Sequence, residues 1–493
     1  QDELHLISGA LGTAVGLFES AIDIVSTWTT ADGKSVKPLI VASTATVRNA
    51  KEQVRRLYGR GIEVFPPQVI DVRDTYFSKE VVVDDLNPAR RYMGVCAPGI
   101  RMIIAQIQIF TIMMLAGQKL LDEYGDDADA YMTAVAYFNA TRELAGMRRH
   151  LDDSVTTAVS DGRTISGLKR RTTGQLTVGE LTSRISSSEI AETLDKLGFR
   201  FDPEQDSTAA REKWATDAKA AKAAGKKMPK SDRTIWPFDA VLATSMLQVG
   251  VDVPRLGLML VVGQPKNTAE YIQASSRVGR SATEHGPGLV LTLANWARPR
   301  DMAHFEQFDY YHRTFYSFVE PLSVTPFSDA SLDRGLTAVL VSCARIFDAV
   351  TPSPSLSPNE GASHAQLRRV EVLDRIVTAV VNRSEIASSS QKLAQVVGAK
   401  LVNRIDQWAQ RSQQQGLSYQ KKKSKTQHLV PLLVSPEEMV LDPDSAMFRV
   451  PNSMREVQPE INLISPGSLL APKTHGGTPK WGFRSKSEGD VDE

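Results

Sequence analysis

Cysteine is scarce in this sequence of 493 residues, where Cys96 and Cys343 are the two present and lie far apart. Two distant cysteines cannot supply the disulfide framework of a small secreted domain or a thiolate metal site. The eight histidines show no ligand spacing with cysteine or acidic residues, so we expect no zinc site. The composition indicates a reduced, cytoplasmic protein.

An excess of charge of one sign is also absent, because 58 Lys and Arg oppose 57 Asp and Glu, for a net charge of +1. Any binding to nucleic acid must therefore come from local patches rather than from a global field. The longest apolar run, residues 100–117, is interrupted by Arg101, Gln106 and Gln108. It favours a buried helix over a membrane span, and we expect no membrane partner.

Apolar runs followed by polar turns and helical segments recur along the chain. They occupy residues 36–48, 132–151, 238–265 and 286–295. Such alternation predicts an α/β fold with parallel sheets, in which 36–48 would begin as a buried strand. Beyond a Pro/Ser-rich linker at 351–363, two helical patterns predict a mostly helical C-terminal extension.

Arg277 and Arg280 lie three residues apart beside a glycine, in the segment QASSRVGR. Cations in this arrangement can neutralise charge that develops on a γ-phosphoryl group, and the guanidinium fork suits phosphate geometry. Upstream, Gly250 and Asp252 follow a buried strand and could approach a ribose and metal-bound phosphates. The alternative is a surface helix with two solvated arginines.

The chain opens with Asp2-Glu3-Leu4-His5, a weak signal alone, and Thr44-Ala45-Thr46 follows before the segments above. This order resembles motifs II, III, V and VI of superfamily 2 helicases. The resemblance implies tandem RecA-like domains, the first only partly present, and a nucleic-acid-dependent ATPase that uses ATP and Mg²⁺. No GxxxxGK[ST] segment occurs, so we expect a missing N-terminal half of the same protein to carry the Walker lysine.

The resemblance assigns a role to each candidate residue. Asp2 would hold Mg²⁺ mainly through water, Glu3 would orient or deprotonate the attacking water, and both count as metal-site residues. His5 would relay nucleotide state, and Arg277 and Arg280 would act as arginine fingers. The ATP-binding candidates are Gly250, Asp252 and Gln273. The candidates for nucleic-acid contact or coupling are Thr44, Thr46, Asn139, Thr182, Arg184 and Thr244. For Asn139, Thr182 and Arg184 the alternative is a purely structural role.

Further stretches narrow the resemblance to the helicase subunit of DISARM anti-phage defence systems. They include QDELHLISGALGTAVGLFE, STATVRN, RYMGVCAPG and FRVPNSMREVQPEINL, over residues 1 to about 463. The resemblance implies a bacterial DNA helicase or translocase that acts on single-stranded DNA or overhangs, beside a DrmB-like subunit. The residues themselves indicate only a nucleic-acid-dependent ATPase. An ATP-gated DNA sensor or clamp that recruits partners and an RNA helicase stay open as alternatives. Intact Glu3, Arg277 and Arg280 argue against a third alternative, an inactive scaffold.

The predicted organisation has four parts. Residues 1–87 would complete the first RecA-like domain, and 88–300 would form the second, with a Lys/Ala-rich insertion near 205–234. Residues 301–350 form an aromatic-rich helical segment, whose rings could stack on bases but are more typical of core packing. Residues 351–493 comprise the linker, the helical extension and the tail.

Overall fold

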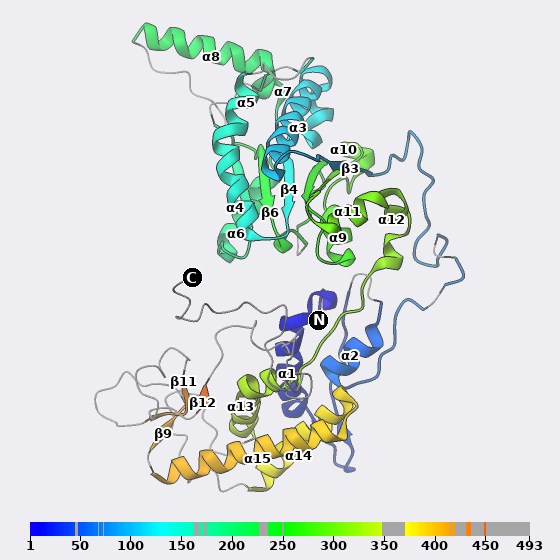
Figure 1. The fold of residues 1–493 in the computed structure, drawn as a ribbon, viewed down its shortest axis with the longest axis vertical. Helices are drawn as coiled ribbons and strands as arrows, with labels where there is room; N and C mark the ends of the chain where they lie inside the picture. Colours follow the sequence, from blue (N-terminus) through cyan, green and yellow to red (C-terminus); the bar gives the residue numbers. More distant parts are fainter. Residues whose placement is uncertain are drawn as a thin grey trace, which may run out of the picture. The chain divides into compact units, whose positions relative to one another are not determined.

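The computed structural model of the chain divides into two compact units (Figure 1). It describes residues 1–44, 48–67, 69–71, 73–161, 167–168, 170–171, 175–225, 235–248, 251–347, 370–414, 416–419, 430–434 and 448–449. Unit 1 comprises residues 1–7, 39–54 and 60–323, and unit 2 comprises 8–38, 55–59 and 324–493. The predicted boundaries at residues 87, 300 and 350 stay predictions.

Unit 1 is built on a six-stranded parallel sheet with the order β3-β8-β7-β4-β6-β5. Its strands are β3 (Arg91–Cys96), β4 (Ala134–Phe138), β5 (Val178–Leu181), β6 (Ala240–Ala243), β7 (Leu258–Val262) and β8 (Leu289–Ala294). The strands predicted within 132–151, 238–265 and 286–295 are confirmed. β4, β6 and β7 are buried at every position, which explains their continuous apolar sequence.

Helices and short helical turns precede, connect and follow the strands of unit 1. They are η1 (Leu4–Leu6), α3 (Met102–Tyr124), η2 (Gly125–Tyr131), α4 (Thr141–His150), η3 (Leu151–Val155), α5 (Thr156–Asp161), α6 (Ser187–Leu197), α7 (Pro203–Asp206), α8 (Thr208–Ala223), η4 (Ser245–Gln248), α9 (Thr268–Ser275), α10 (Ala282–His285), α11 (Pro299–Glu306), α12 (Phe308–Thr314) and η5 (Phe315–Phe318). α8 occupies the Lys/Ala-rich segment.

The two faces of the sheet carry separate cores because successive strand residues point to opposite sides. Ala136 and Phe138 of β4 pack with residues of α3, α4 and α5 on one face. Val135 and Tyr137 of β4 pack with Leu197, at the end of α6, and with residues of α9 and α12 on the other face. The unit therefore has helices on both faces of a parallel sheet, as the α/β prediction required.

The apolar run at 100–117 forms most of α3, which confirms a helix there. By length and composition, Met102–Tyr131 could cross a membrane, but half of its most apolar window is buried inside the protein. Phe110, Met114 and Leu115 are at most 1% exposed and belong to the core beneath the sheet. This packing is that of a core helix.

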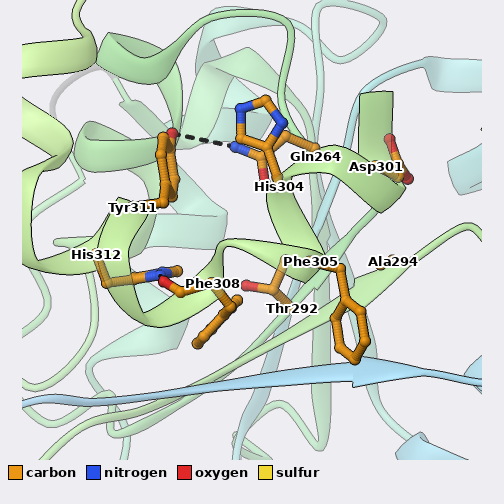
Figure 2. A pocket seen from close by; sticks show the side chains of 9 residues that line it. All are labelled: Gln264, Thr292, Ala294, Asp301, His304, Phe305, Phe308, Tyr311 and His312. Atoms are coloured by element: carbon orange, nitrogen blue, oxygen red, sulfur yellow. Dashed lines mark hydrogen bonds between the residues drawn. The ribbon is translucent and has the colours of Figure 1, made fainter. Parts of the chain in front are cut away.

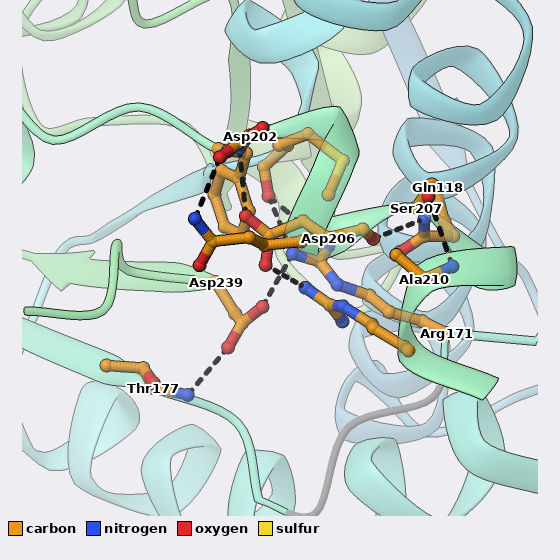
Figure 3. Close-up of polar contacts among 12 residues, drawn as sticks. Gln118, Arg171, Thr177, Asp202, Asp206, Ser207, Ala210 and Asp239 are labelled. Atoms are coloured by element: carbon orange, nitrogen blue, oxygen red, sulfur yellow. Dashed lines mark hydrogen bonds and ion pairs between the residues drawn. The ribbon is translucent and has the colours of Figure 1, made fainter. Parts of the chain in front are cut away.

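One edge of the sheet is fixed by a buried ion pair between Arg171 and Asp239 (Figure 3). The Arg171 side chain is fully buried and lies 2.5 Å from Asp239 Oδ1, while Asp239 Oδ2 accepts the Thr177 N–H at 2.7 Å. Asp239 directly precedes β6 and Thr177 directly precedes β5. The pair thus joins the starts of two neighbouring strands.

Unit 2 is mainly helical. Its elements are α1 (Gly9–Val25), β1 (Trp28–Thr29), β2 (Ser35–Val36), α13 (Asp329–Ile346), α14 (Val370–Ser388), α15 (Gln391–Gln414), β9 (Leu417–Ser418), β10 (Val430–Pro431), β11 (Leu433–Val434) and β12 (Phe448–Arg449). A core that includes Leu336, Ile376 and Trp408 joins α13, α14 and α15. The helical C-terminal extension is confirmed over these residues, whereas the linker at 351–363 and the tail lie outside the described residues.

The buried strand expected within 36–48 is wrong. β2 ends at Val36, and Leu39 and Val41 are 87% and 72% exposed. A buried parallel strand needs a neighbour on each side and a covered face. In the described part of the chain no sheet strand lies beside 39–44; its backbone instead contacts the N-terminal residues, with Ser43 N–H donating to Gln1 O at 2.8 Å. The helix expected just beyond is present as α2 (Ala50–Tyr58).

Candidate active site

The Asp2–His5 segment is held against residues 41–44 of the same unit. Leu4 N–H donates to Ser43 O at 3.0 Å, and His5 N–H donates to Thr44 Oγ1 at 3.2 Å. Glu3 has a φ of 52°, in the left-handed region that costs a non-glycine residue about 1–2 kcal/mol. The fold therefore brings together the segments that resemble motifs II and III and holds Glu3 in a strained conformation.

Asp2 has an exposed carboxylate that stays ionised. The Ser43 hydroxyl donates to it, and the Glu3 N–H does so at 2.9 Å, and these two bonds lower the pKa of Asp2 below its usual value. Among the described residues no group of three or more His, Cys, Asp or Glu side chains could hold a metal ion. Mg²⁺ commonly uses only one or two carboxylates with water and phosphate oxygens, so Asp2 and Glu3 fit that ion.

His5 connects the acidic segment to α9. Its ring is buried, and Nε2 lies 2.7 Å from Gln273 Oε1, an acceptor, so Nε2 carries the hydrogen in this arrangement. On the other side of the ring, Nδ1 lies 3.4 Å from Glu3 Oε2 and 3.5 Å from Thr44 Oγ1. The His5 imidazole thus lies against the Glu3 carboxylate, the Thr44 hydroxyl and the Gln273 amide, which belong to three separate segments of the chain.

The turn after α9 presents the two arginines. Asn267 caps α9 by accepting the Glu270 N–H at 2.8 Å, and the helix ends at Ser275. Gly279 has a φ of +64°, and a Cβ there would lie 2.5 Å from the backbone of Gly288. Only glycine fits this turn, which places Arg280 directly after the close approach.

Arg277 and Arg280 differ in their partners. Arg277 donates to Gln248 O, and to Val251 O at 3.0 Å, whereas Arg280 Nη1 lies 2.7 Å from Asp252 Oδ1. Partial burial lowers the pKa of Arg277, and Arg280 adds to the lowering, while the carboxylates of Glu3 and Asp252 oppose it. The carboxylates of Glu3 and Asp252 therefore interact electrostatically with the guanidinium group of Arg277 within unit 1.

A series of hydrogen bonds between side chains of unit 1 positions Arg277. Tyr137 of β4 donates to Glu270 of α9, and Gln248 Nε2 donates to Tyr137 Oη at 3.1 Å. The backbone carbonyl of Gln248 then receives Arg277. The position of Arg277 thus depends on the central strand of the sheet.

Several sequence-predicted residues lie elsewhere or outside the described residues. Thr46 and Gly250 lie outside them. Asn139 follows β4 and donates to the carbonyls of residues 262–264. Thr182 donates to Glu180 Oε1 at 2.7 Å after β5, where Arg184 is exposed, and the buried Thr244 follows β6. These residues share the carboxyl edge of three adjacent strands, and their roles stay predictions.

Sequence reasoning missed Ser43, Tyr137 and Gln248. Ser43 precedes the predicted Thr44 within a run of small hydroxyl residues, which was a usable signal. Tyr137 and Gln248 sit in or beside apolar runs and gave no signal, because their contacts depend on strand order.

The aromatic segment packs on the sheet, as its spacing favoured. Tyr311 is 4% exposed, and His312 Nε2 lies 2.8 Å from Tyr271 Oη. Figure 2 shows a small pocket among these side chains, where Gln264 Nε2 donates to Tyr311 Oη at 3.2 Å. Its nine lining residues do not include Asp2, Glu3, Asp252, Arg277 or Arg280. Tyr310 and Tyr316 remain 60% exposed.

Comparison with known proteins gives one sequence family and one curated relative. Residues 219–282 match the helicase conserved C-terminal domain. The chain is 35% identical over 417 residues to the DISARM protein DrmA of Bacillus paralicheniformis, covering 84% of this chain and 33% of that protein. The chain thus spans about a third of the length of the relative it matches.

Solved structures of helicases are also similar, at low identity. DUF1998 helicase MrfA, bound to DNA and AMPPNP, is 16% identical with a TM-score of 0.39, over 69% of this chain and 36% of that one. Mycobacterium smegmatis helicase Lhr, bound to ssDNA and AMP-PNP, is 14% identical with a TM-score of 0.42, over 80% of this chain and 37% of that one.

Proposed function

We propose that this chain, which resembles DISARM protein DrmA and matches the helicase conserved C-terminal domain over residues 219–282, is a superfamily 2 helicase, a nucleic-acid-dependent ATPase that moves along or unwinds DNA in defence against phage. Its α/β fold, with a parallel RecA-like sheet and a helical C-terminal region, agrees with this assignment. The contact of His5 with Gln273 is the observation that carries the proposal.

That contact supports coupling between nucleotide and nucleic acid. His5 lies against Glu3 and Thr44 on one side and against Gln273 on the other, four residues before Arg277. A shift of the acidic segment would therefore move α9, the helix that directly precedes the turn with the two arginines. Coupled movements of this kind allow a motor protein to close around ATP and to reopen after hydrolysis, and this cycle drives its steps along a strand.

The proposed roles follow from the surroundings of each side chain. Asp2, ionised and exposed, would hold Mg²⁺, which when bound neutralises charge on the phosphate oxygens. Glu3 accepts a proton from the attacking water. Arg280 leaves Asp252 to meet charge on the γ-phosphoryl oxygens, and Arg277 approaches from the same turn.

The finer assignments extend the DISARM resemblance. We infer single-stranded DNA or an overhang as the substrate, a DrmB-like subunit as partner, and a cytoplasmic location. Thr44, Asn139, Thr182, Arg184 and Thr244 are the proposed coupling and backbone-contact residues. Asp252 and Gln273 are the described residues proposed on the nucleotide side.

ATP hydrolysis by the complete protein tests this function. Turnover is measured without nucleic acid and with single-stranded DNA, duplex DNA or RNA. DNA should stimulate it, and Glu3→Gln should lower it by about 10²–10⁴-fold, because general-base catalysis contributes that much. Glu192→Gln, the same change on the exposed face of α6, is the matched control and should leave turnover unchanged.

Other outcomes of the ATPase assay would favour one of the alternative functions or contradict the proposed site. Stimulation by RNA alone would replace DNA with RNA as the substrate. Stimulated hydrolysis with no strand separation or translocation would indicate the sensor or clamp. Absent turnover, or equal turnover in both glutamine variants, would contradict the assignment of the active site.

A further inference from the structure

Trp296 lies in the loop between β8 and α11, with 49% of its surface exposed. Its indole Nε1 donates to the carbonyl of Ile100 at 3.1 Å, in the loop after β3. A hydrogen bond therefore fixes the ring while much of it faces solvent. A ring held in this way loses little conformational freedom when a ligand stacks on it.

Two exposed arginines lie close along the chain to the two residues of this hydrogen bond. Arg101 directly follows Ile100, and Arg300 lies four residues beyond Trp296. Among the described residues, neither Arg101 nor Arg300 forms an ion pair. No acidic side chain of the described residues therefore pairs with either charge.

The nearby acids are already engaged. Glu143 of α4 pairs with Arg298 at 2.6 Å, and the buried Asp301 accepts the Asn295 N–H at 2.9 Å. The pair between Arg298 and Glu143 also ties the loop after β8 to the helix after β4. The patch formed by Arg101, Trp296 and Arg300 is thus supported by neighbouring loops and has a net positive charge.

This patch lies at the carboxyl edge of the parallel sheet, where β3 and β8 end. Ligands of open α/β sheets bind at that edge. Asn139, one of the proposed backbone-contact residues, follows β4 at the same edge. An aromatic ring beside cations suits a single strand, since bases stack on the ring and phosphates meet the arginines.

We propose that Trp296, Arg101 and Arg300 form a contact site for single-stranded nucleic acid, with the indole stacking on a base and the arginines binding phosphates. The inference rests on the proposed function, because it assigns a further part of the nucleic-acid path to residues outside the helicase motifs. An acidic protein segment would meet the arginines but would not need a stacking face.

The test measures binding of a labelled oligothymidylate to the complete protein by fluorescence anisotropy. Trp296→Ala should weaken binding about tenfold, whereas Trp296→Phe should retain most of it, because phenylalanine still stacks. The control is Trp28→Ala on β1, where the tryptophan is 50% exposed, and its affinity should match that of the wild type. Arg101→Gln and Arg300→Gln should each reduce the slope of log affinity against log salt by about 1.

The possible failures are distinguishable. If the wild type binds the oligonucleotide and its ATPase is stimulated, but Trp296→Ala behaves like Trp28→Ala, the contact site is wrong and the proposed function stands. If the wild type shows neither binding nor stimulation, both are wrong. The phenylalanine variant and the two glutamine variants keep the proposal testable if Trp296→Ala does not fold.

Discussion

Arg277 and Arg280 lie three residues apart, yet their surroundings give them different tasks at the scale of single residues. Arg277 is half-buried and holds two backbone carbonyls, so it contributes to the local fold. Arg280 forms a partly exposed ion pair with Asp252, and such pairs contribute little to stability. Substituting each arginine should therefore separate folding from catalysis.

Arg280→Ala should change the free energy of unfolding by less than about 1 kcal/mol and lower stimulated ATP turnover by roughly 10³-fold. Arg277→Ala should lower turnover as well and also destabilise by about 1–3 kcal/mol, because it leaves carbonyls without a charged donor. Urea unfolding and ATPase assays on both variants measure this, with exposed Arg149→Ala of α4 as control. Equal stability losses in both variants would contradict the distinction.

His312 predicts a dependence of stability on pH. Burial lowers its pKa below the ordinary 6.5, although Asp309 and the Phe308 carbonyl oppose this and His304 adds to it. The unfolded chain then binds more protons than the folded one, so stability is complete above 6.5 and is lost as the pH falls below it. Urea midpoints measured between about pH 7 and pH 5 should fall, and should fall less in His312→Asn. An identical fall in the variant would assign the effect to other groups.

At the scale of elements, the edge strand β5 and its neighbour β6 depend on the Asp239–Arg171 pair (Figure 3). Asp239→Asn removes the charge that compensates a fully buried guanidinium, and breaking such a pair costs about 3–5 kcal/mol. Urea unfolding should show this loss, while Asp153→Asn on the exposed surface should change little. A loss below about 1 kcal/mol would mean that the guanidinium gains water or another partner.

The sequence predicted elements best where burial alone decides them. β4, β6, β7 and β8 are apolar runs because both faces of their sheet are covered, so they could be recognised without knowing the strand order. The run at 36–48 has the same apolar character, but no strand lies beside it among the described residues. It therefore does not form the buried strand that its composition predicts. Arg171 stands beside Arg170 in the sequence, where two adjacent cations give no sign of burial, whereas the order of the strands buries it against Asp239.

The candidate site was predictable where motif residues are spaced along the chain in a known order. That spacing pointed to Glu3, His5, Gln273 and Arg280, and the fold brings these residues into one unit. It could not reveal that Gln248 holds Arg277 through a backbone carbonyl, because any residue offers the same carbonyl. Contacts made by the main chain leave no trace in side-chain patterns.

For the molecule as a whole, acids and arginines are present but no GxxxxGK[ST] segment is. The backbone amides and lysine of such a loop supply most contacts to the phosphates. With a net charge of +1, the chain also lacks a general attraction for a polyanion. We therefore expect the 493-residue chain alone to bind MgATP weakly, with a Kd of about 1 mM or above, near −4 kcal/mol.

Isothermal titration of this chain with MgATP measures that affinity, and Arg280→Ala serves as a comparison. Weak binding that the variant weakens further would place Arg280 at the phosphates even without a Walker lysine. Micromolar binding would overturn the expectation that tight phosphate binding needs the amides and lysine of a GxxxxGK[ST] loop. The cations of this chain, Arg277 and Arg280 first, would then have to hold the nucleotide themselves, and their substitution would abolish binding rather than turnover alone.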